Sequence, residues 1–293
     1  MSASPQEIRT LLCHRDVELA IHCLSSALEL TADPVKLVIH DDGSLTAEDR
    51  ATIEARLPGT RILNRRDADA IMAEKLARHP HARQFRDGSV WGLKLLDVVL
   101  AEPGTCFYLD GDIRFFRPFQ GLFTAEATSG RCVFLRDTVW IAYSVRPWHL
   151  CDRRGLQVVS GINTGLTLCD PAIFDLDFID WFLAQPDWRV IPAWTEPTCW
   201  AALAARTQAR AVSPEQLPNL YPSARITGKT IGGHFLSAYR DQWQTQINAP
   251  LCEEEPTVEV MTVGLKRLSA PGLAASQCKR KLQNTWLRNH WKP

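Results

Sequence analysis

Short apolar runs alternate with segments of helical periodicity up to residue 110, and this alternation constrains the fold more than any other feature of the sequence. The apolar runs predict strands at 8–13, 35–39, 62–63 and 106–109. The periodic segments predict helices at 17–30, just beyond Thr46, at 67–77 and at 90–101. Alternating strands and helices favour an α/β fold with a mostly parallel central sheet flanked by helices. Ligands bind such sheets beyond the carboxyl ends of the strands, where Asp42 and Asp110 fall.

The rest of the chain continues the pattern less regularly. Further strands are expected at 131–135 and 165–168, and further helices at 174–184 and 197–206. The stretch RHPHARQFRDG, residues 78–88, is interpreted as a basic loop, and residues 213–230 as irregular. We expect one main domain over residues 1–249 and a C-terminal appendage over residues 250–293.

Composition narrows the class of protein. The 33 Lys and Arg residues balance the 33 Asp and Glu residues, so no overall charge attracts the chain to nucleic acid. The charged N-terminus does not look like a secretory signal, and no apolar run is long enough to span a membrane. The nine cysteines are scattered without a Cys-x-x-Cys pair, which favours buried thiols in a cytoplasmic protein.

The strand expected at 106–109 runs directly into Asp110-Gly111-Asp112. Two carboxylates separated by one residue face a common space only if the strand has just broken, and Gly111 permits that break. Such a pair suits a hard divalent cation such as Mg²⁺ or Mn²⁺. A solvated acidic turn is the alternative, whereas an EF-hand is disfavoured because Arg114 stands where a further ligand is needed.

Four more motifs accompany the acidic pair. Lys94 lies in Trp-Gly-Leu-Lys-Leu-Leu, sixteen residues before Asp110. After the pair come Asn163-Thr-Gly165 before an apolar run, Glu196-Pro-Thr-Cys-Trp, and Gly233-His234-Phe235-Leu236 followed by Arg240 and Trp243. In order and spacing these motifs resemble those of GT-A nucleotide-sugar glycosyltransferases, most closely the retaining glycosyltransferase family 8 of glycogenin and the bacterial lipooligosaccharide galactosyltransferases. The resemblance covers residues 8–243.

The chain also departs from that family. The distance from Asp110 to Asn163 is longer than in glycogenin, so we expect an inserted loop between Trp140 and Gln157. Three motif residues differ: Pro197 replaces Gln, Ser237 replaces Gly, and Arg240 replaces Lys. The planar guanidinium of an arginine can donate two parallel hydrogen bonds to a phosphate, which the ammonium of a lysine cannot do.

The resemblance implies a role for each motif. Asp110, Asp112 and His234 would hold one Mn²⁺ or Mg²⁺ at the diphosphate of a nucleotide sugar, and Arg240 would lie beside that diphosphate. Lys94 would reach the donor, although a lysine on an apolar helix can also extend to solvent. Asn163 would bind the transferred sugar, and Glu196 would bind sugar hydroxyls or stabilise positive charge at the anomeric carbon. Turn chemistry for Asn163 and a helix-start carboxylate for Glu196 are the structural alternatives.

Donor binding is also assigned to Gly111 and Asp42. Asp42 would contact base or ribose, or would simply form the turn of Asp-Asp-Gly-Ser. His14 and Asp16, after the first strand, are further candidates for base contacts.

The function expected from this resemblance is metal-dependent transfer of a sugar, with retention, from a UDP-sugar to an unidentified glycan, lipid or protein. A phosphatase with Asp110 as nucleophile and a non-catalytic nucleotide-sugar-binding module are the alternatives. The C-terminal stretch 278–292 mixes Lys and Arg with Leu and Trp. It is either a helix that packs on the body of the protein or a peripheral contact with the inner face of an anionic membrane.

Overall fold

The computed structural model of the chain describes residues 5–139, 141–189, 191–251 and 254–290, with side chains described as far as residue 282. The strands are β1 (Gln6–Leu12), β2 (Val35–Asp41), β3 (Arg61–Leu63), β4 (Cys106–Leu109), β5 (Ile113–Phe115), β6 (Phe119–Gln120), β7 (Cys132–Arg136), β8 (Ile162–Cys169), β9 (Arg210–Val212), β10 (Gly232–His234), β11 (Val258–Glu259) and β12 (Thr262–Gly264). The helices are α1 (Val17–Leu30), α2 (Ala47–Arg56), α3 (Arg65–Lys75), α4 (Pro80–Gly88), α5 (Val90–Leu100), α6 (Ala125–Thr128), α7 (Leu176–Leu183), α8 (Pro192–Ala204), α9 (Gln244–Ile247) and α10 (Ala270–His290).

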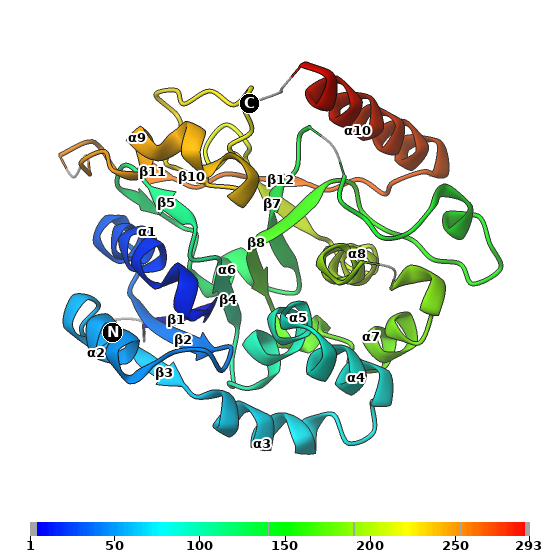
Figure 1. Cartoon of the computed structure of the whole chain (residues 1–293), viewed down its shortest axis with the longest axis horizontal. Coiled ribbons are helices and arrows are strands. Elements are labelled where there is room, and N and C mark those ends of the chain that lie inside the picture. Colours follow the sequence, from blue (N-terminus) through cyan, green and yellow to red (C-terminus); the bar gives the residue numbers. More distant parts are fainter. Residues whose placement is uncertain (1–4, 140, 190, 252–253, 291–293) are drawn as a thin grey trace.

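Eight strands form one sheet in the order β12-β9-β7-β8-β4-β1-β2-β3 (Figure 1). The strands β3, β2, β1 and β4 are parallel neighbours, and β9 is parallel to β7. Strand β8 runs antiparallel between β4 and β7, and β12 runs antiparallel to β9. The mostly parallel α/β sheet expected from the sequence is confirmed.

Helices cover both faces of the sheet (Figure 1). Helices α3, α4, α5, α7 and α8 pack on one face, where they meet Cys106 and Tyr108 of β4. Helices α1 and α2 pack on the other face, against Phe107 and Leu109 of the same strand. Because both faces are covered, β4 is apolar along its whole length.

Residues 78–88 are not the expected basic loop, since most of them form α4. Pro80 opens this helix, and the carboxylate of Asp180 on α7 accepts hydrogen bonds from the backbone N–H groups of His81 and Ala82 at 2.9 Å. Ala82 and Phe85 are buried in the core. The charged residues of the stretch conceal this short apolar face, which is why the prediction is wrong.

Residues after 250 contribute two strands. Strand β11 pairs with β6, and β12 forms one edge of the main sheet. Leu273 of α10 is buried in the main core. The division at residue 249 remains a prediction.

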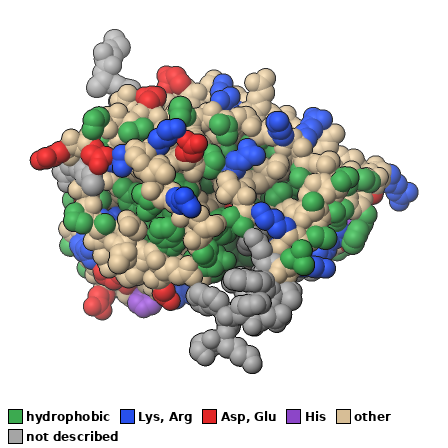
Figure 2. All heavy atoms as spheres, turned by 90° about the horizontal axis from the view of Figure 1, so that it is seen from above, with side chains coloured by type: hydrophobic (Ala, Val, Ile, Leu, Met, Phe, Trp, Pro, Cys, Tyr) green, Lys and Arg blue, Asp and Glu red, His purple; other side chains and the backbone are tan. Residues whose placement is uncertain are grey.

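Helix α10 carries the basic C-terminal stretch, and the side chains of Trp286 and Trp291 lie outside the described residues. On the face seen in Figure 2, Lys and Arg side chains are scattered together with Asp and Glu side chains and hydrophobic ones. No helix in the described chain is both long and apolar enough to cross a bilayer.

The expected inserted loop lies between β7 and β8. Residues 137–161 connect these strands, and a short 3-10 helix, Pro147–Leu150, lies within this connection. Tyr143 and His149 anchor the loop because both are buried, whereas Trp140 is outside the described residues. Of the eight cysteines that the structure describes, all are free thiols and five are buried.

Candidate active site

The carboxyl ends of β1, β2 and β4 meet at one edge of the sheet, as expected from the sequence. The acidic turn Asp110-Gly111-Asp112 joins β4 to β5 at this edge. The backbone N–H of Asp110 donates to the carbonyl of Gly165 at 2.6 Å, and the carbonyl of Asp112 accepts from Phe235 at 2.8 Å. A Cβ atom at Gly111 would lie 2.8 Å from Cβ of Ala20, so this close approach of the turn to α1 requires glycine.

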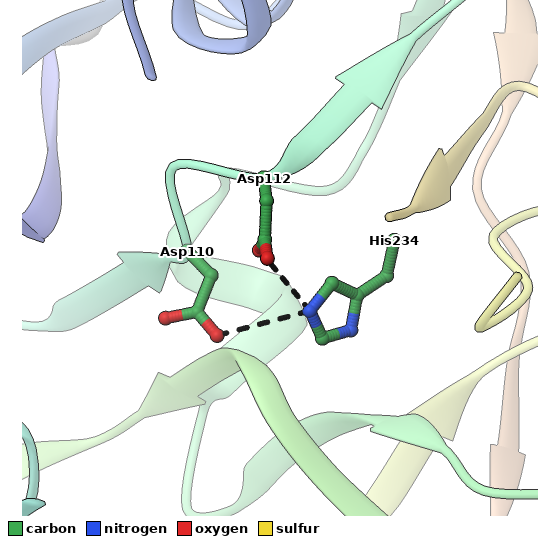
Figure 3. Close-up of side chains that lie close together, drawn as sticks. All are labelled: Asp110, Asp112 and His234. Atoms are coloured by element: carbon green, nitrogen blue, oxygen red, sulfur yellow. Dashed lines mark ion pairs between the residues drawn. The ribbon is translucent and has the colours of Figure 1, made fainter. Parts of the chain in front are cut away.

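The structure brings Asp110, Asp112 and His234 together (Figure 3). Nε2 of His234 lies 3.1 Å from Oδ1 of Asp112 and 3.9 Å from Oδ2 of Asp110. One ligand atom from each of the three residues lies within 4.8 Å of the others. Two carboxylates and an imidazole in this arrangement fit a divalent cation such as Mn²⁺ or Mg²⁺.

Strand β10 delivers His234 to the acidic turn. It pairs antiparallel with β5, and His234 stands opposite Ile113, the residue after Asp112. The ring of His234 rests against Gly165 of β8, where an added Cβ atom would lie 2.6 Å from Cε1 of the imidazole. The glycine of the Asn163-Thr-Gly165 motif therefore makes room for the histidine.

Lys94 does not extend to solvent. Its Nζ donates to both oxygens of Asp110, at 2.7 and 2.8 Å, and the hydroxyl of Tyr108 also donates to that carboxylate. Nζ lies 5.0 Å from the ring centre of Tyr108 and 5.7 Å from that of Trp91. The lysine thus places a buried positive charge at the acidic turn.

Arg240 links the acidic turn to the end of β1. Its Nη2 lies 2.7 Å from Oδ2 of Asp112, and its Nη1 lies 3.3 Å from Oδ1 of Asp16. His14, the other candidate at that end, is bonded through Nδ1 to Asp49 at 2.7 Å. Only Asp16 of these two candidates therefore joins the network of the acidic turn.

Opposite charges stabilise each ionised group of the site. Burial alone raises the pKa of Asp112, but His234 and Arg240 outweigh burial and hold that pKa below its usual value. Burial lowers the pKa of His234, but Asp112 and Asp110 outweigh this effect and raise it. In the same way Asp110 keeps the pKa of the buried Lys94 above its usual value.

Two cavities meet at the acidic turn. The larger, of about 670 Å³, extends over the ends of β1 and β2 and is lined by residues 11–16, Asp42, Ser44 and Arg240 among others. The smaller, of about 280 Å³, is lined by Asp137, Asn163, Glu196 and His234 among others. Trp91, Lys94, Asp110, Asp112 and Ser237 line both cavities. The acidic turn therefore separates two adjoining binding spaces.

Asp42 borders the larger cavity and also forms the expected turn. Its Oδ1 accepts from the backbone N–H of Ser44 at 2.9 Å and from the hydroxyl of Ser44 at 2.6 Å. The turn therefore occupies one carboxylate oxygen of Asp42 and fixes the side chain at the rim of the cavity.

Glu196 lies inside α8 and does not open it, because the helix begins at Pro192 and includes Pro197. The expected helix start at residue 197 is therefore wrong. Oε2 of Glu196 accepts from the hydroxyl of Thr164 at 2.7 Å, while Oε1 is buried with no hydrogen-bond partner among the described residues. Burial raises the pKa of Glu196 to about 7, against the opposing effect of Lys94.

Asn163 lies beside Glu196 in the smaller cavity. Its Oδ1 accepts from the backbone N–H of Gly165 at 2.9 Å, which is the turn chemistry expected of the motif. Its amide nitrogen lies 3.4 Å from Oδ1 of Asp137.

Sequence reasoning missed Asp137, which lines the smaller cavity directly after β7. Its Oδ1 accepts from Nδ2 of Asn219 at 2.7 Å and from the hydroxyl of Tyr221 at 3.0 Å. Burial raises its pKa to about 7. The rule that singled out Asp42 and Asp110, a polar residue after a strand, also applies to Asp137, because a strand was expected at 131–135.

No known sequence family matches the chain, and neither does any curated protein sequence. Solved structures do match. Mouse xyloside xylosyltransferase 1 in its apo form matches with a TM-score of 0.53 at 12% sequence identity, over 81% of this chain and 99% of that one. An active-site mutant of LgtC matches with a TM-score of 0.50 at 11% identity, over 79% of this chain and 87% of that one.

The mannosyltransferase Ktr4p from S. cerevisiae matches with a TM-score of 0.44 at 11% identity, over 69% of this chain and 66% of that one. The chain thus spans about two thirds of the length of Ktr4p. At such identities a structural match establishes the fold. The sheet order, the covering helices and the first two matches together show that the chain has the GT-A fold expected from its sequence.

Proposed function

We propose that the chain is a metal-dependent glycosyltransferase that moves a sugar from a nucleotide-diphosphate sugar to an acceptor. One observation carries the proposal: in a GT-A fold, Asp110, Asp112 and His234 converge at the junction of two adjoining cavities. One of the structural matches, mouse xyloside xylosyltransferase 1, is a sugar-transferring enzyme, which supports the same class of reaction.

Asp110, Asp112 and His234 are the residues that would hold Mn²⁺ or Mg²⁺, and the imidazole favours Mn²⁺. A bound divalent cation supplies positive charge that stabilises the departing diphosphate. Arg240 adds a guanidinium on the larger-cavity side of Asp112. Its planar fork suits a phosphate oxygen pair, so we assign it to the diphosphate.

The larger cavity is the proposed donor site. Asp42 and Gly111, which line it, are assigned to the nucleotide, and Lys94, which reaches the acidic turn, to the donor sugar or phosphate. A uridine nucleotide is proposed on the resemblance to glycosyltransferase family 8 alone.

The smaller cavity is the proposed place where the sugar reacts and the acceptor enters. Asn163 would bind the transferred sugar, and Glu196 would face its anomeric carbon. Glycosyl transfer passes through a state with positive charge at that carbon, which an ionised carboxylate stabilises. The acceptor is a glycan, a lipid or a protein, and transfer with retention is proposed from the resemblance. An NMR assay of the product tests retention, and inversion at the anomeric carbon would contradict the assignment to family 8.

The two alternative functions have less support. A phosphatase with Asp110 as nucleophile gives no role to His234, which points at both aspartates (Figure 3). It also requires a carboxylate free to attack, whereas both oxygens of Asp110 accept hydrogen bonds from Lys94. A binding module that has lost catalysis would not need the buried carboxylate of Glu196 beside the metal-binding residues.

A thermal-shift panel tests the proposed function. Ligands that bind only the folded chain raise its melting temperature, so nucleoside diphosphates and UDP-, GDP- and ADP-sugars are compared with and without Mn²⁺. Stabilisation by one donor only in the presence of Mn²⁺ is expected. Asp112→Asn should abolish this shift, whereas Asp177→Asn, at a carboxylate that is 95% exposed on α7, should retain it. A shift that persists in Asp112→Asn would remove the proposed metal role.

A further inference from the structure

The two ring nitrogens of His234 have different surroundings. Nε2 faces the carboxylates of Asp110 and Asp112, where a cation is proposed to bind (Figure 3). Nδ1 points away from them and lies 2.9 Å from Oδ1 of Asn219, inside the protein. Asn219 itself is 4% exposed, so no bulk water replaces this contact.

The neighbours of Asn219 fix which way its amide points. Its Nδ2 lies 2.7 Å from Oδ1 of Asp137 and 3.1 Å from the carbonyl oxygen of Arg136. A backbone carbonyl can only accept, so a flipped amide would place its oxygen against the carbonyl oxygen of Arg136. The amide oxygen therefore faces His234, and Nδ1 of the imidazole must be the donor.

The backbone holds the two residues side by side. Leu220 donates its N–H to the carbonyl of His234 at 2.9 Å, and His234 donates its N–H to the carbonyl of Pro218 at 3.0 Å. Asn219 thus forms a parallel bridge with His234, although residues 213–230 contain no regular strand or helix. A Cβ atom at Gly233 would lie 2.7 Å from Cδ1 of Leu220, which shows how closely the two segments approach.

We propose that Asn219 is a positioning residue that keeps the proton of His234 on Nδ1 and leaves Nε2 available to a divalent cation. The inference rests on the proposed metal site and adds the residue that orients one of its ligands. Metal-binding histidines commonly donate the other ring N–H to such a partner, and loss of the partner weakens metal binding about 10- to 100-fold. Asp137 acts one step further away, because it fixes the orientation of Asn219.

The first experiment measures Mn²⁺ affinity from the electron paramagnetic resonance signal of the free ion, at one fixed pH. Asn219→Leu keeps a similar branched shape but cannot accept a hydrogen bond, so the Mn²⁺ affinity of the variant should fall about 10- to 100-fold. Gln216→Leu is the matched control. Gln216 is a buried amide in the same irregular segment, but it bonds to the backbone of Glu259 and Met261, so its loss should leave Mn²⁺ affinity unchanged.

The outcomes separate this inference from the proposed function. If the wild type binds Mn²⁺ and Asn219→Leu binds it equally well, the positioning role is wrong and the metal site stands. If the wild type and His234→Ala bind Mn²⁺ equally poorly, the proposed metal site fails. If Asn219→Leu does not fold, as judged by circular dichroism, Asn219→Ser takes its place in the same comparison.

A second experiment does not depend on metal binding. Nitrogen-15 NMR of histidine-labelled protein shows which ring nitrogens carry a proton, and His234→Gln identifies the signals of His234. At neutral pH, Nδ1 of His234 should be protonated both with and without Mg²⁺. An unprotonated Nδ1 would overturn the inference even if the metal site proved correct.

Discussion

The imidazole of His234 packs directly on the backbone of Gly165, with no room for a side chain between them. An added Cβ atom at Gly165 would lie 2.6 Å from Cε1 and 2.8 Å from Nδ1 of the ring. Because β8 is a buried central strand, its backbone cannot yield easily. The position of the proposed histidine ligand therefore depends on the absence of a side chain at this residue.

Gly165→Ala should displace the ring of His234 away from the acidic turn. We expect a loss of about 1–3 kcal/mol in the free energy of unfolding, typical of overpacking, together with weaker Mn²⁺ binding. Urea denaturation and Mn²⁺ titration measure the two effects. The matched control is Gly88→Ala at the end of α4, where an added Cβ atom meets nothing within 4 Å. Unchanged Mn²⁺ affinity in Gly165→Ala would contradict the proposed geometry of the metal site.

Lys94→Met should destabilise the protein because it leaves the carboxylate of Asp110 without its buried ion-pair partner. Breaking such a pair costs on the order of 3 kcal/mol. Added Mn²⁺ should stabilise this variant more than the wild type, because the cation replaces the lost positive charge. Lys36→Met, at a lysine that is 55% exposed, should change the free energy of unfolding by less than about 0.5 kcal/mol. Equal stabilisation of Lys94→Met and wild type by Mn²⁺ would argue against a cation at Asp110.

Glu196→Gln should abolish sugar transfer and flatten part of the dependence of stability on pH. In the folded chain the pKa of Glu196 is raised to about 7 from an ordinary value of 4.5. Between these two values the folded chain holds a proton that the unfolded chain has released, so the free energy of unfolding falls as pH rises. Urea denaturation at pH 5 and pH 7 should therefore show that the free energy of unfolding falls less between these pH values in the variant than in the wild type.

Two comparisons make the Glu196 experiment decisive. Asp137 has a raised pKa for the same reason, so part of the pH dependence should remain in Glu196→Gln. Glu54→Gln, at an exposed position on α2, should behave like the wild type. An identical pH dependence in Glu196→Gln and wild type would show that Glu196 is ionised at both pH values.

Removal of residues 283–293 should reduce binding to anionic liposomes if the C-terminal stretch contacts a membrane. Lys279 and Leu282 are exposed on α10, so a basic and an apolar side chain lie together on the surface of this helix. Co-sedimentation of full-length and shortened protein with phosphatidylserine vesicles measures the difference, and phosphatidylcholine vesicles are the control. Equal sedimentation of the two forms would remove the proposed membrane contact, and with it the peripheral location at the inner face.

The fold and the acidic turn could be predicted because their signals are local. A run of apolar residues marks each strand, and Asp42 and Asp110 follow such runs directly. The approach of His234 was predicted only through its spacing from the other motifs, since β10 has three residues and follows an irregular segment. No alternation of apolar and polar residues in the sequence indicates β10.

Other parts of the site could not be predicted in this way. Asn219 lies in that irregular segment, and its place beside His234 is set by two backbone hydrogen bonds to β10. Backbone hydrogen bonds of this kind do not depend on residue type, so no sequence pattern indicates them. Glu196 was expected to open a helix because of the resemblance to family 8 and the helix expected at 197–206, yet α8 begins at Pro192 and includes Pro197. Pro197 is the sixth residue of α8, beyond the first turn, so it removes the intrahelical hydrogen bond that its N–H would donate to the carbonyl of Ala193.

Strand β12 has a consequence for how the protein is made. It covers the outer edge of β9, but it comes about fifty residues later in the chain. While a ribosome is still synthesising the segment between them, β9 presents an unpaired edge that can bind a strand of another nascent chain. Expression at low temperature or with a chaperone that shields nascent chains should therefore raise the yield of this protein.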